Sequence, residues 1–159
     1  MSSTTAPPTT APPATAPPAT APPASRVQLA LNVSDLNAAI EFYSSLFDTR
    51  PDKVRDGYAN FAISEPPLKL VLMEGGEPGT LNHLGVEVPS TDEVAAATSR
   101  LSGSGLDTAV EDEVTCCFAV QDKVWVHGPD DEAWEVYTVL ADSEVRDDTG
   151  QAGPTACCS

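Results

Sequence analysis

The sequence predicts an α+β fold in which two β-α-β-β-β modules pair, after a disordered proline-rich N-terminal tail. Strand-like and helix-like segments follow one another in the same order twice along the chain. A shift of 55 residues places Gln28 on His83, which indicates that the second half repeats the first. Eight of the 15 prolines lie in residues 1–25, a segment without charged or aromatic side chains. These observations predict two modules and an N-terminal tail.

The domain boundaries follow from composition. In the N-terminal tail, Thr-Ala-Pro-Pro recurs with a period of five residues, which favours extended polyproline II and cannot form an apolar core. The remaining chain is long enough to fold without disulfides. The expected parts are a tail at 1–25, a folded domain at 26–143 with modules at about 26–75 and 80–143, and a flexible C-terminal tail at 144–159.

The first module begins with a strand, because residues 27–33 alternate apolar and polar side chains. Ser34 or Asp35 can cap the following helix, in which apolar residues recur at helical spacing from Leu36 to Phe47. Further strands are expected at three places, of which the first is the weakest: 50–55, 58–63 and 68–73.

The second module repeats this order. Ser90 or Thr91 is again a helix cap. A shift of 65 residues aligns 68–73 with 133–138 and places Leu70 on Glu135, so an insertion in the second hairpin is expected. The predicted elements are a strand at 81–88, a helix at 94–101, and strands at 108–110, 118–126 and 134–140.

The charge balance restricts the partners. Eight basic residues face 24 acidic ones, a formal net charge of −16, so nucleic acid and anionic membrane surfaces are poor partners. The chain has no apolar run of the roughly 18–20 residues that a membrane span needs, and no secretory signal. We therefore expect a cytoplasmic protein whose four cysteines are free thiols or ligands, and whose oligomeric state is open.

Three polar residues occupy comparable places on predicted strands. Gln28 and His83 lie in the first strand of each module, and Glu135 lies in the closing strand. An amide oxygen, an imidazole and a carboxylate around one cavity would form a three-ligand metal site with open positions. A hydrogen-bonded core histidine and a water-facing glutamate are the simpler alternative, and spacing alone favours it.

Several separated segments then resemble one family, the bacterial C–As lyases of organoarsenical detoxification. These enzymes belong to the vicinal-oxygen-chelate superfamily, with glyoxalases, extradiol dioxygenases and bleomycin- or fosfomycin-resistance proteins. The resemblance covers about 26–143. The segments that carry it are 27–33, 58–63, 81–88, 115–126 and 134–137.

The resemblance implies the vicinal-oxygen-chelate fold and an Fe(II) held by Gln28, His83 and Glu135. It also implies a lyase that uses dioxygen to cleave the carbon–arsenic bond of methylarsenite or aromatic arsenites and to release arsenite. Gln28 stands where many superfamily members have histidine. Leu70 stands where four-ligand glyoxalases have glutamate, which argues against glyoxalase chemistry.

Cys116 and Cys117 are the candidate arsenic-binding residues, because trivalent arsenic is thiophilic. Adjacent residues of a regular strand point to opposite faces, so chelation needs a loop or bulge, and we expect a loop over 111–115. Burial of one cysteine in the core is the alternative. The role of Cys157 and Cys158 is open.

Two other functions remain possible on the sequence. One is a non-enzymatic protein that sequesters thiophilic metalloids or Cd²⁺ through its cysteines. The other is a different superfamily enzyme, such as a glyoxalase or a ring-cleaving dioxygenase. The cysteine pair disfavours the ring-cleaving enzyme, which has no need of thiols.

Overall fold

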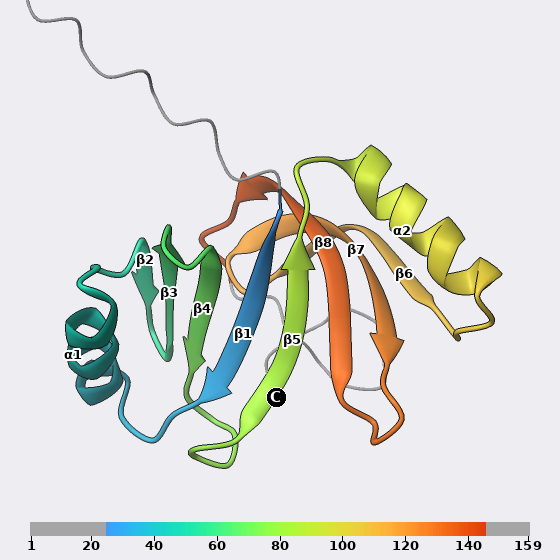
Figure 1. The fold of residues 1–159 in the computed structure, drawn as a ribbon. Coiled ribbons are helices and arrows are strands. Elements are labelled where there is room, and N and C mark those ends of the chain that lie inside the picture. Colours follow the sequence, from blue (N-terminus) through green and yellow to red (C-terminus); the bar gives the residue numbers. More distant parts are fainter. Residues whose placement is uncertain (1–24, 146–159) are drawn as a thin grey trace, which may run out of the picture.

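The computed structural model describes residues 25–145, and both tails lie largely outside this range. The described part has the predicted order of two β-α-β-β-β modules (Figure 1). The first module comprises β1 (Arg26–Asn32), α1 (Leu36–Phe47), β2 (Lys53–Arg55), β3 (Tyr58–Ile63) and β4 (Leu68–Met73). The second comprises β5 (Leu81–Glu87), α2 (Thr91–Gly103), β6 (Ala109–Cys116), β7 (Ala119–His127) and β8 (Ala133–Asp142).

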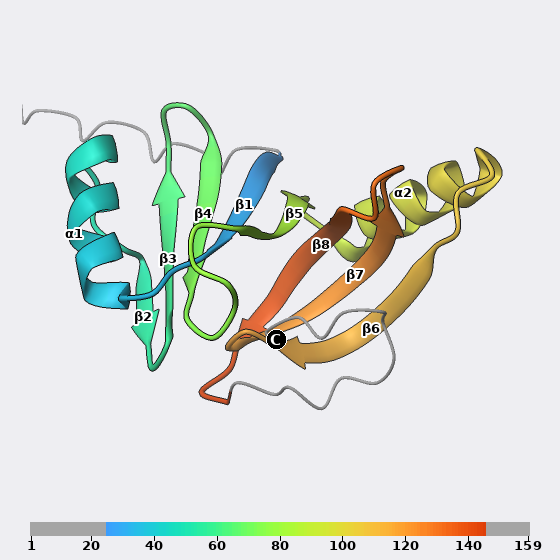
Figure 2. The ribbon, with the colours of Figure 1, turned by 90° about the horizontal axis from the view of Figure 1, so that it is seen from below.

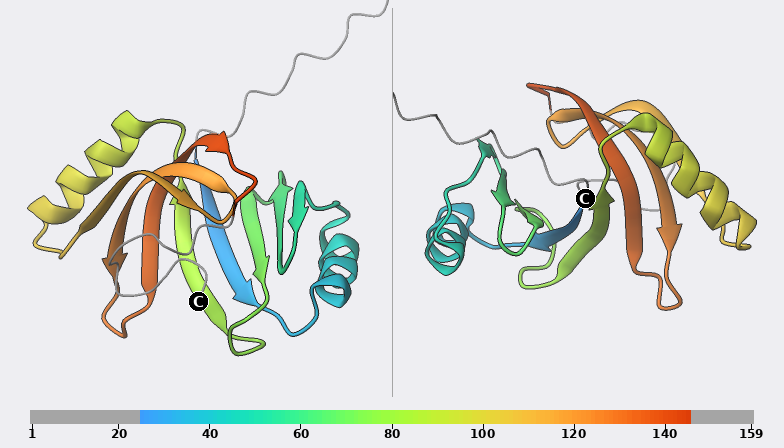
Figure 3. Two further views of the ribbon diagram at one scale, coloured as in Figure 1. Left: turned by 180° about the vertical axis from the view of Figure 1, so that it is seen from behind. Right: turned by 45° about the horizontal axis from the view of Figure 1, so that its top comes forward.

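All eight described strands join one sheet in the order β2-β3-β4-β1-β5-β8-β7-β6. In each module the first strand runs parallel to the last, β1 beside β4 and β5 beside β8. The antiparallel pair β1–β5 joins the modules at the centre. The sheet curls strongly, and the two helices lie at opposite sides of the molecule (Figures 2 and 3). The strands β1, β5 and β8 are therefore neighbours at the centre of the curled sheet.

The central strand β1 places different side chains on its two faces. Leu29 and Leu31 pack with the apolar residues beneath α1, where Phe61 is fully buried. The opposite face, inside the curl, carries the buried polar side chains of Gln28 and Asn32. A buried polar face is costly unless its groups find partners, so this face is the place to look for a binding site.

Both helices begin at side-chain caps among those expected. The Asp35 carboxylate accepts a hydrogen bond from the Ala38 amide at 2.9 Å, and the Ser90 hydroxyl oxygen accepts one from the Glu93 amide at 3.3 Å. Each cap satisfies an amide that the first helical turn leaves without a partner. No helix within residues 25–145 is long and apolar enough to cross a membrane.

The expected loop over 111–115 is wrong, because these residues belong to β6. The strand contains a bulge in which Glu113 has a φ of 49°, and the Asp122 carboxylate accepts the Glu113 amide at 2.8 Å. The chain reverses at Cys117 and Phe118, whose φ values of 51° and 64° are those of a two-residue hairpin turn. A hairpin turn, rather than a preceding loop, thus displaces Cys117 from the strand.

Candidate active site

Gln28, His83 and Glu135 meet inside the curl. They come from the adjacent strands β1, β5 and β8, and each is at most 6% exposed. Gly85 lies opposite both Gln28 and Glu135 in the strand register. A Cβ at Gly85 would come within 3.2 Å of side-chain atoms of both residues, so the missing side chain lets these two polar groups approach each other.

The three side chains present one atom each to a common point. Gln28 Nε2 lies 2.7 Å from Glu135 Oε1 and 3.0 Å from His83 Nε2, and these last two atoms are 3.4 Å apart. Neighbouring ligands at about 2.1 Å from an octahedral ion are themselves about 3 Å apart. The three donors therefore fit one face of a metal's coordination sphere once the Gln28 amide turns its oxygen inward.

The ring of His83 is oriented for this role. Its Nδ1 lies 2.7 Å from Asn82 Oδ1, and an Nδ1–H that donates to this carbonyl oxygen leaves the Nε2 lone pair directed at the common point. Among residues 25–145 no cluster of three His, Cys, Asp or Glu could hold a metal. The third donor here would be an amide.

Lys123 on β7 forms a buried ion pair with Glu135. Its Nζ lies 2.8 Å from Glu135 Oε2, with side-chain exposures of 1% and 3%. Burial opposes ionisation of the carboxyl group, but the Lys123 ammonium and the hydrogen-bonded His83 hold the pKa of Glu135 far below its usual range. Glu135 is thus a carboxylate with one oxygen on Lys123 and the other at the common point.

We expect Lys123→Met to lower the free energy of unfolding of the metal-free protein by about 3–5 kcal/mol, because it leaves the Glu135 charge buried without its cation. Denaturant unfolding measures this change. The double variant Lys123→Met/Glu135→Gln is the control, and it should recover most of the loss. A double variant as unstable as Lys123→Met would show that packing, rather than the uncompensated charge, causes the effect.

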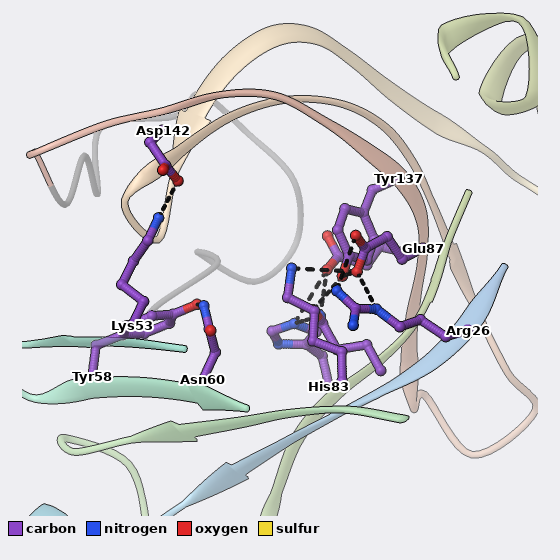
Figure 4. A network of polar contacts seen from close by, with 11 residues as sticks. Arg26, Lys53, Tyr58, Asn60, His83, Glu87, Tyr137 and Asp142 are labelled. Atoms are coloured by element: carbon purple, nitrogen blue, oxygen red, sulfur yellow. Dashed lines mark hydrogen bonds and ion pairs between the residues drawn. The ribbon is translucent and has the colours of Figure 1, made fainter. Parts of the chain in front are cut away.

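A second set of contacts holds the other end of the Gln28 amide, and Figure 4 shows three of the residues involved, Tyr137, Glu87 and Arg26, close together. The Tyr137 hydroxyl donates to Gln28 Oε1 at 2.6 Å and lies 3.2 Å from Glu87 Oε2. Glu87 is held by Arg26 at 2.9 Å and by Lys69 at 3.5 Å. Burial, followed by the Glu135 and Glu87 charges, raises the pKa of Tyr137 well above its usual value. Tyr137 therefore remains a neutral hydroxyl that can donate or accept.

Cys116 and Cys117 line the same pocket as the three donors, at the end of the β6–β7 hairpin. Their sulfur atoms are 3.3 Å apart. Two sulfurs bonded to one soft atom at about 2.3 Å, with roughly 90° between the bonds, lie about 3.3 Å apart. The spacing of the pair therefore suits chelation of one thiophilic atom beside the three-donor set.

The expectation that the cysteines are not in disulfides is wrong for Cys117, which is disulfide-bonded. Chelation by the pair hence requires reduction of this bond. Cys157 and Cys158 lie outside the described residues.

The strand register corrects one residue of the predicted repeat. Gly85 pairs with Glu135 between β5 and β8, and its counterpart Ala30 pairs with Val71 between β1 and β4. Val71, rather than Leu70, therefore occupies the place of Glu135 in the first module. Leu70 packs in the apolar cluster beneath α1. Both residues are apolar, so the first module adds no carboxylate here.

Comparison with protein families gives one match over most of the chain. The model of the Glyoxalase/Bleomycin resistance protein/Dioxygenase superfamily matches residues 25–136. The chain belongs to this superfamily. The assignment agrees with the two-module fold and confirms the superfamily that the sequence resemblance predicted.

Two of the relatives share 60% of aligned residues with this chain. One is the trivalent organoarsenical cleaving enzyme of Thermomonospora curvata, aligned over 137 residues that cover 85% of this chain and 89% of that protein. The other is the cadmium-induced protein CadI of Mycobacterium tuberculosis, aligned over 141 residues that cover 84% and 93%. A trivalent organoarsenical cleaving enzyme of a Bacillus species is 37% identical over 136 residues, 82% of this chain and 80% of that enzyme.

Solved structures share the fold. Homoprotocatechuate 2,3-dioxygenase of Arthrobacter globiformis matches with a TM-score of 0.56 and 21% identity, over 80% of this chain and 40% of that one. The Mn(II)-bound glyoxalase of Novosphingobium aromaticivorans matches with a TM-score of 0.55 and 22% identity, over 77% and 42%. The chain thus spans about two-fifths of each enzyme, and at this identity the likeness concerns the fold.

Proposed function

We propose that the protein is an Fe(II)-dependent, dioxygen-using lyase that cleaves the carbon–arsenic bond of trivalent organoarsenicals such as methylarsenite and aromatic arsenites, and releases arsenite. One observation carries the proposal. A sulfur pair spaced for one thiophilic atom opens onto the same small pocket as a three-donor set spaced for one metal ion. The 60% identity to the organoarsenical cleaving enzyme of T. curvata supports this combination.

In this proposal Gln28, His83 and Glu135 hold the metal. Fe(II) in such a site keeps coordination positions open and supplies the redox chemistry with dioxygen. Lys123 keeps Glu135 ionised and fixes its second oxygen. The His83 ring is held by Asn82, so that Nε2 is the ligand nitrogen.

Cys116 and Cys117 fix the substrate. Each thiol replaces one hydroxyl group of the trivalent organoarsenical, forming an As–S bond and releasing one water. After both thiols have reacted, arsenic carries two sulfurs and still carries its organic group. Because the pair and the metal ligands line one pocket, the carbon–arsenic bond is held close to the metal rather than reached by diffusion. The remaining walls of this pocket include Val71 and Tyr58, which exclude water.

Tyr137 is a positioning residue for Gln28. When the Gln28 oxygen turns toward the metal, its Nε2 group faces Tyr137, whose hydroxyl then accepts this hydrogen bond and donates to Glu87. We expect Tyr137→Phe to weaken Fe(II) binding about tenfold, a typical effect for a partner of a metal ligand. Anaerobic titration against a chelator measures the affinity.

Two variants separate this role from a structural one. Tyr58→Phe removes another buried hydroxyl, whose bonding partner is Asn60, and should leave Fe(II) affinity unchanged. In a Gln28→Ala background, Tyr137→Phe should cause no further loss of affinity. An equal loss in both backgrounds would contradict a role through Gln28.

A second candidate function is sequestration of a thiophilic ion without turnover. The relative CadI favours it, because its name records induction by cadmium. In this case the cysteines would bind Cd²⁺ or arsenite, and Gln28, His83 and Glu135 would complete the coordination.

Oxygen uptake separates the two functions. Reduced, Fe(II)-loaded protein is mixed with methylarsenite in an oxygen electrode, with inorganic arsenite as the matched control substrate. We expect repeated oxygen consumption with methylarsenite alone. Tight binding of methylarsenite without oxygen consumption would favour sequestration instead.

A further inference from the structure

The pocket of the candidate active site adjoins a larger cavity. The inner pocket, between Gln28, His83, Glu135 and the two cysteines, has a volume of about 20 Å³. The outer cavity, of about 150 Å³, lies between β3, β4 and the ends of β7 and β8. Four side chains line both cavities and mark their junction: Tyr58, Lys69, Cys117 and Gln121.

The two volumes suit different groups. About 20 Å³ accommodates one water-sized group, whereas a cavity of about 150 Å³ accommodates a benzene ring. Because Cys117 lines both, an arsenic atom on its sulfur lies at the junction. A methyl group on that arsenic fits the inner pocket, but an aromatic ring fits only the outer cavity.

The charges of the outer cavity are balanced. Three cations (Arg26, Lys53 and Lys69) and three carboxylates (Asp52, Glu87 and Asp142) line it. Arg26 and Lys69 form ion pairs with Glu87, and Lys53 forms one with Asp142. Figure 4 shows Lys53, Asp142, Tyr58 and Asn60 on one side and Arg26 and Glu87 on the other. Such a lining suits an uncharged polar group better than an anion.

Gln121 supplies a second, independent observation. Its side chain is 6% exposed, and its Oε1 is buried without a hydrogen-bond partner. An unpaired buried carbonyl oxygen costs about 1–3 kcal/mol, so its presence at the junction points to a ligand donor. Tyr58 lines the same junction with an O–H group that stays protonated, because burial raises the pKa of Tyr58 to about 12. An acceptor and a donor together match one hydroxyl group.

We propose that the outer cavity is the subsite for an uncharged aromatic group on arsenic, and that Gln121 Oε1 accepts a hydrogen bond from a hydroxyl group of the ligand. This inference rests on the proposed binding of organoarsenicals by Cys116 and Cys117. The hydroxyl group belongs to the ring, because the two thiols displace both hydroxyl groups of arsenic as water in the final complex.

Cavity-filling variants test the subsite. Val139 on β8 and Ala62 on β3 both line the outer cavity and are exposed, so Val139→Trp and Ala62→Phe should fold. Leu140→Trp is the matched control, because Leu140 is the next residue on β8, is 45% exposed and does not line the cavity. Dissociation constants are measured anaerobically on reduced, Fe(II)-loaded protein, where no turnover occurs.

We expect Val139→Trp and Ala62→Phe to weaken phenylarsenite binding at least about tenfold, which corresponds to about 1.4 kcal/mol, and methylarsenite binding by less than about twofold. Leu140→Trp should change neither. Equal effects on both ligands, or none, would overturn the subsite. If the wild-type protein binds neither arsenical, the proposed function fails instead, so the two failures are distinguishable.

Gln121→Leu tests the hydrogen bond. We expect binding to weaken about fivefold for each ligand that carries the recognised hydroxyl group. We expect a loss for hydroxyphenylarsenite alone, with phenylarsenite and methylarsenite as the matched control ligands. Unchanged binding of hydroxyphenylarsenite, or an equal loss for all three ligands, would overturn the role of Gln121.

Discussion

His83→Ala and Glu135→Ala are each expected to abolish Fe(II) binding and turnover, because a three-ligand site cannot spare one strong donor. His83 supplies the only imidazole of the set, and Glu135 supplies its only negative charge. Gln28→Ala should weaken both properties, and Gln28→His should be tolerated, since imidazole suits the same metal. Metal analysis after anaerobic loading measures occupancy.

Glu135→Ala leaves Lys123 buried without its carboxylate, so loss of metal must be separated from loss of fold. The double variant Glu135→Ala/Lys123→Met removes both charges and is the control, with circular dichroism as the measure of folding. We expect it to be folded and metal-free. Full iron occupancy in Glu135→Ala would contradict the ligand assignment.

Cys116→Ser/Cys117→Ser is expected to remove turnover while leaving Fe(II) bound. The sulfurs hold arsenic beside the metal but are not metal ligands in the proposed site. A serine hydroxyl is a hard donor with little affinity for a thiophilic atom. Product formation and iron content are measured on the same fully reduced sample, because Cys117 is otherwise in a disulfide.

The tail pair is the matched control for the inner pair. Cys157→Ser/Cys158→Ser should leave kcat nearly unchanged and at most raise the apparent KM at low substrate, since a tethered thiol pair can only raise the local concentration of arsenical. An inactive tail variant combined with an active inner variant would show that the substrate binds elsewhere.

The order of elements could be predicted from the sequence because strands and helices in this chain differ in period. Alternation over 27–33 and helical spacing from Leu36 to Phe47 correspond to β1 and α1. The course of β6 could not be predicted. The acidic residues over 111–113 have little strand propensity, and pairing with β7, aided by the Asp122 side chain, overrides this preference.

The three proposed metal ligands could be found because each is a polar residue at a matching place on a predicted strand. The sequence could not assign roles to Lys123, Tyr137 and Gln121. The partner of Lys123 is 12 residues away in sequence and that of Tyr137 is 109 residues away, and Gln121 Oε1 has no hydrogen-bond partner in the described structure. A signal did exist for two of them. Gln121 and Lys123 are polar residues two apart in β7, and therefore share the face that lines the pocket.

Release of inorganic arsenite tests the central proposal most directly. Reduced protein is loaded with Fe(II) without oxygen, methylarsenite is added, air is admitted, and inorganic arsenite is separated from methylarsenite and quantified. We expect more than one arsenite per protein molecule, and none when either iron or oxygen is omitted. Methylarsenite recovered intact from iron-loaded, aerated protein would contradict carbon–arsenic cleavage by this site.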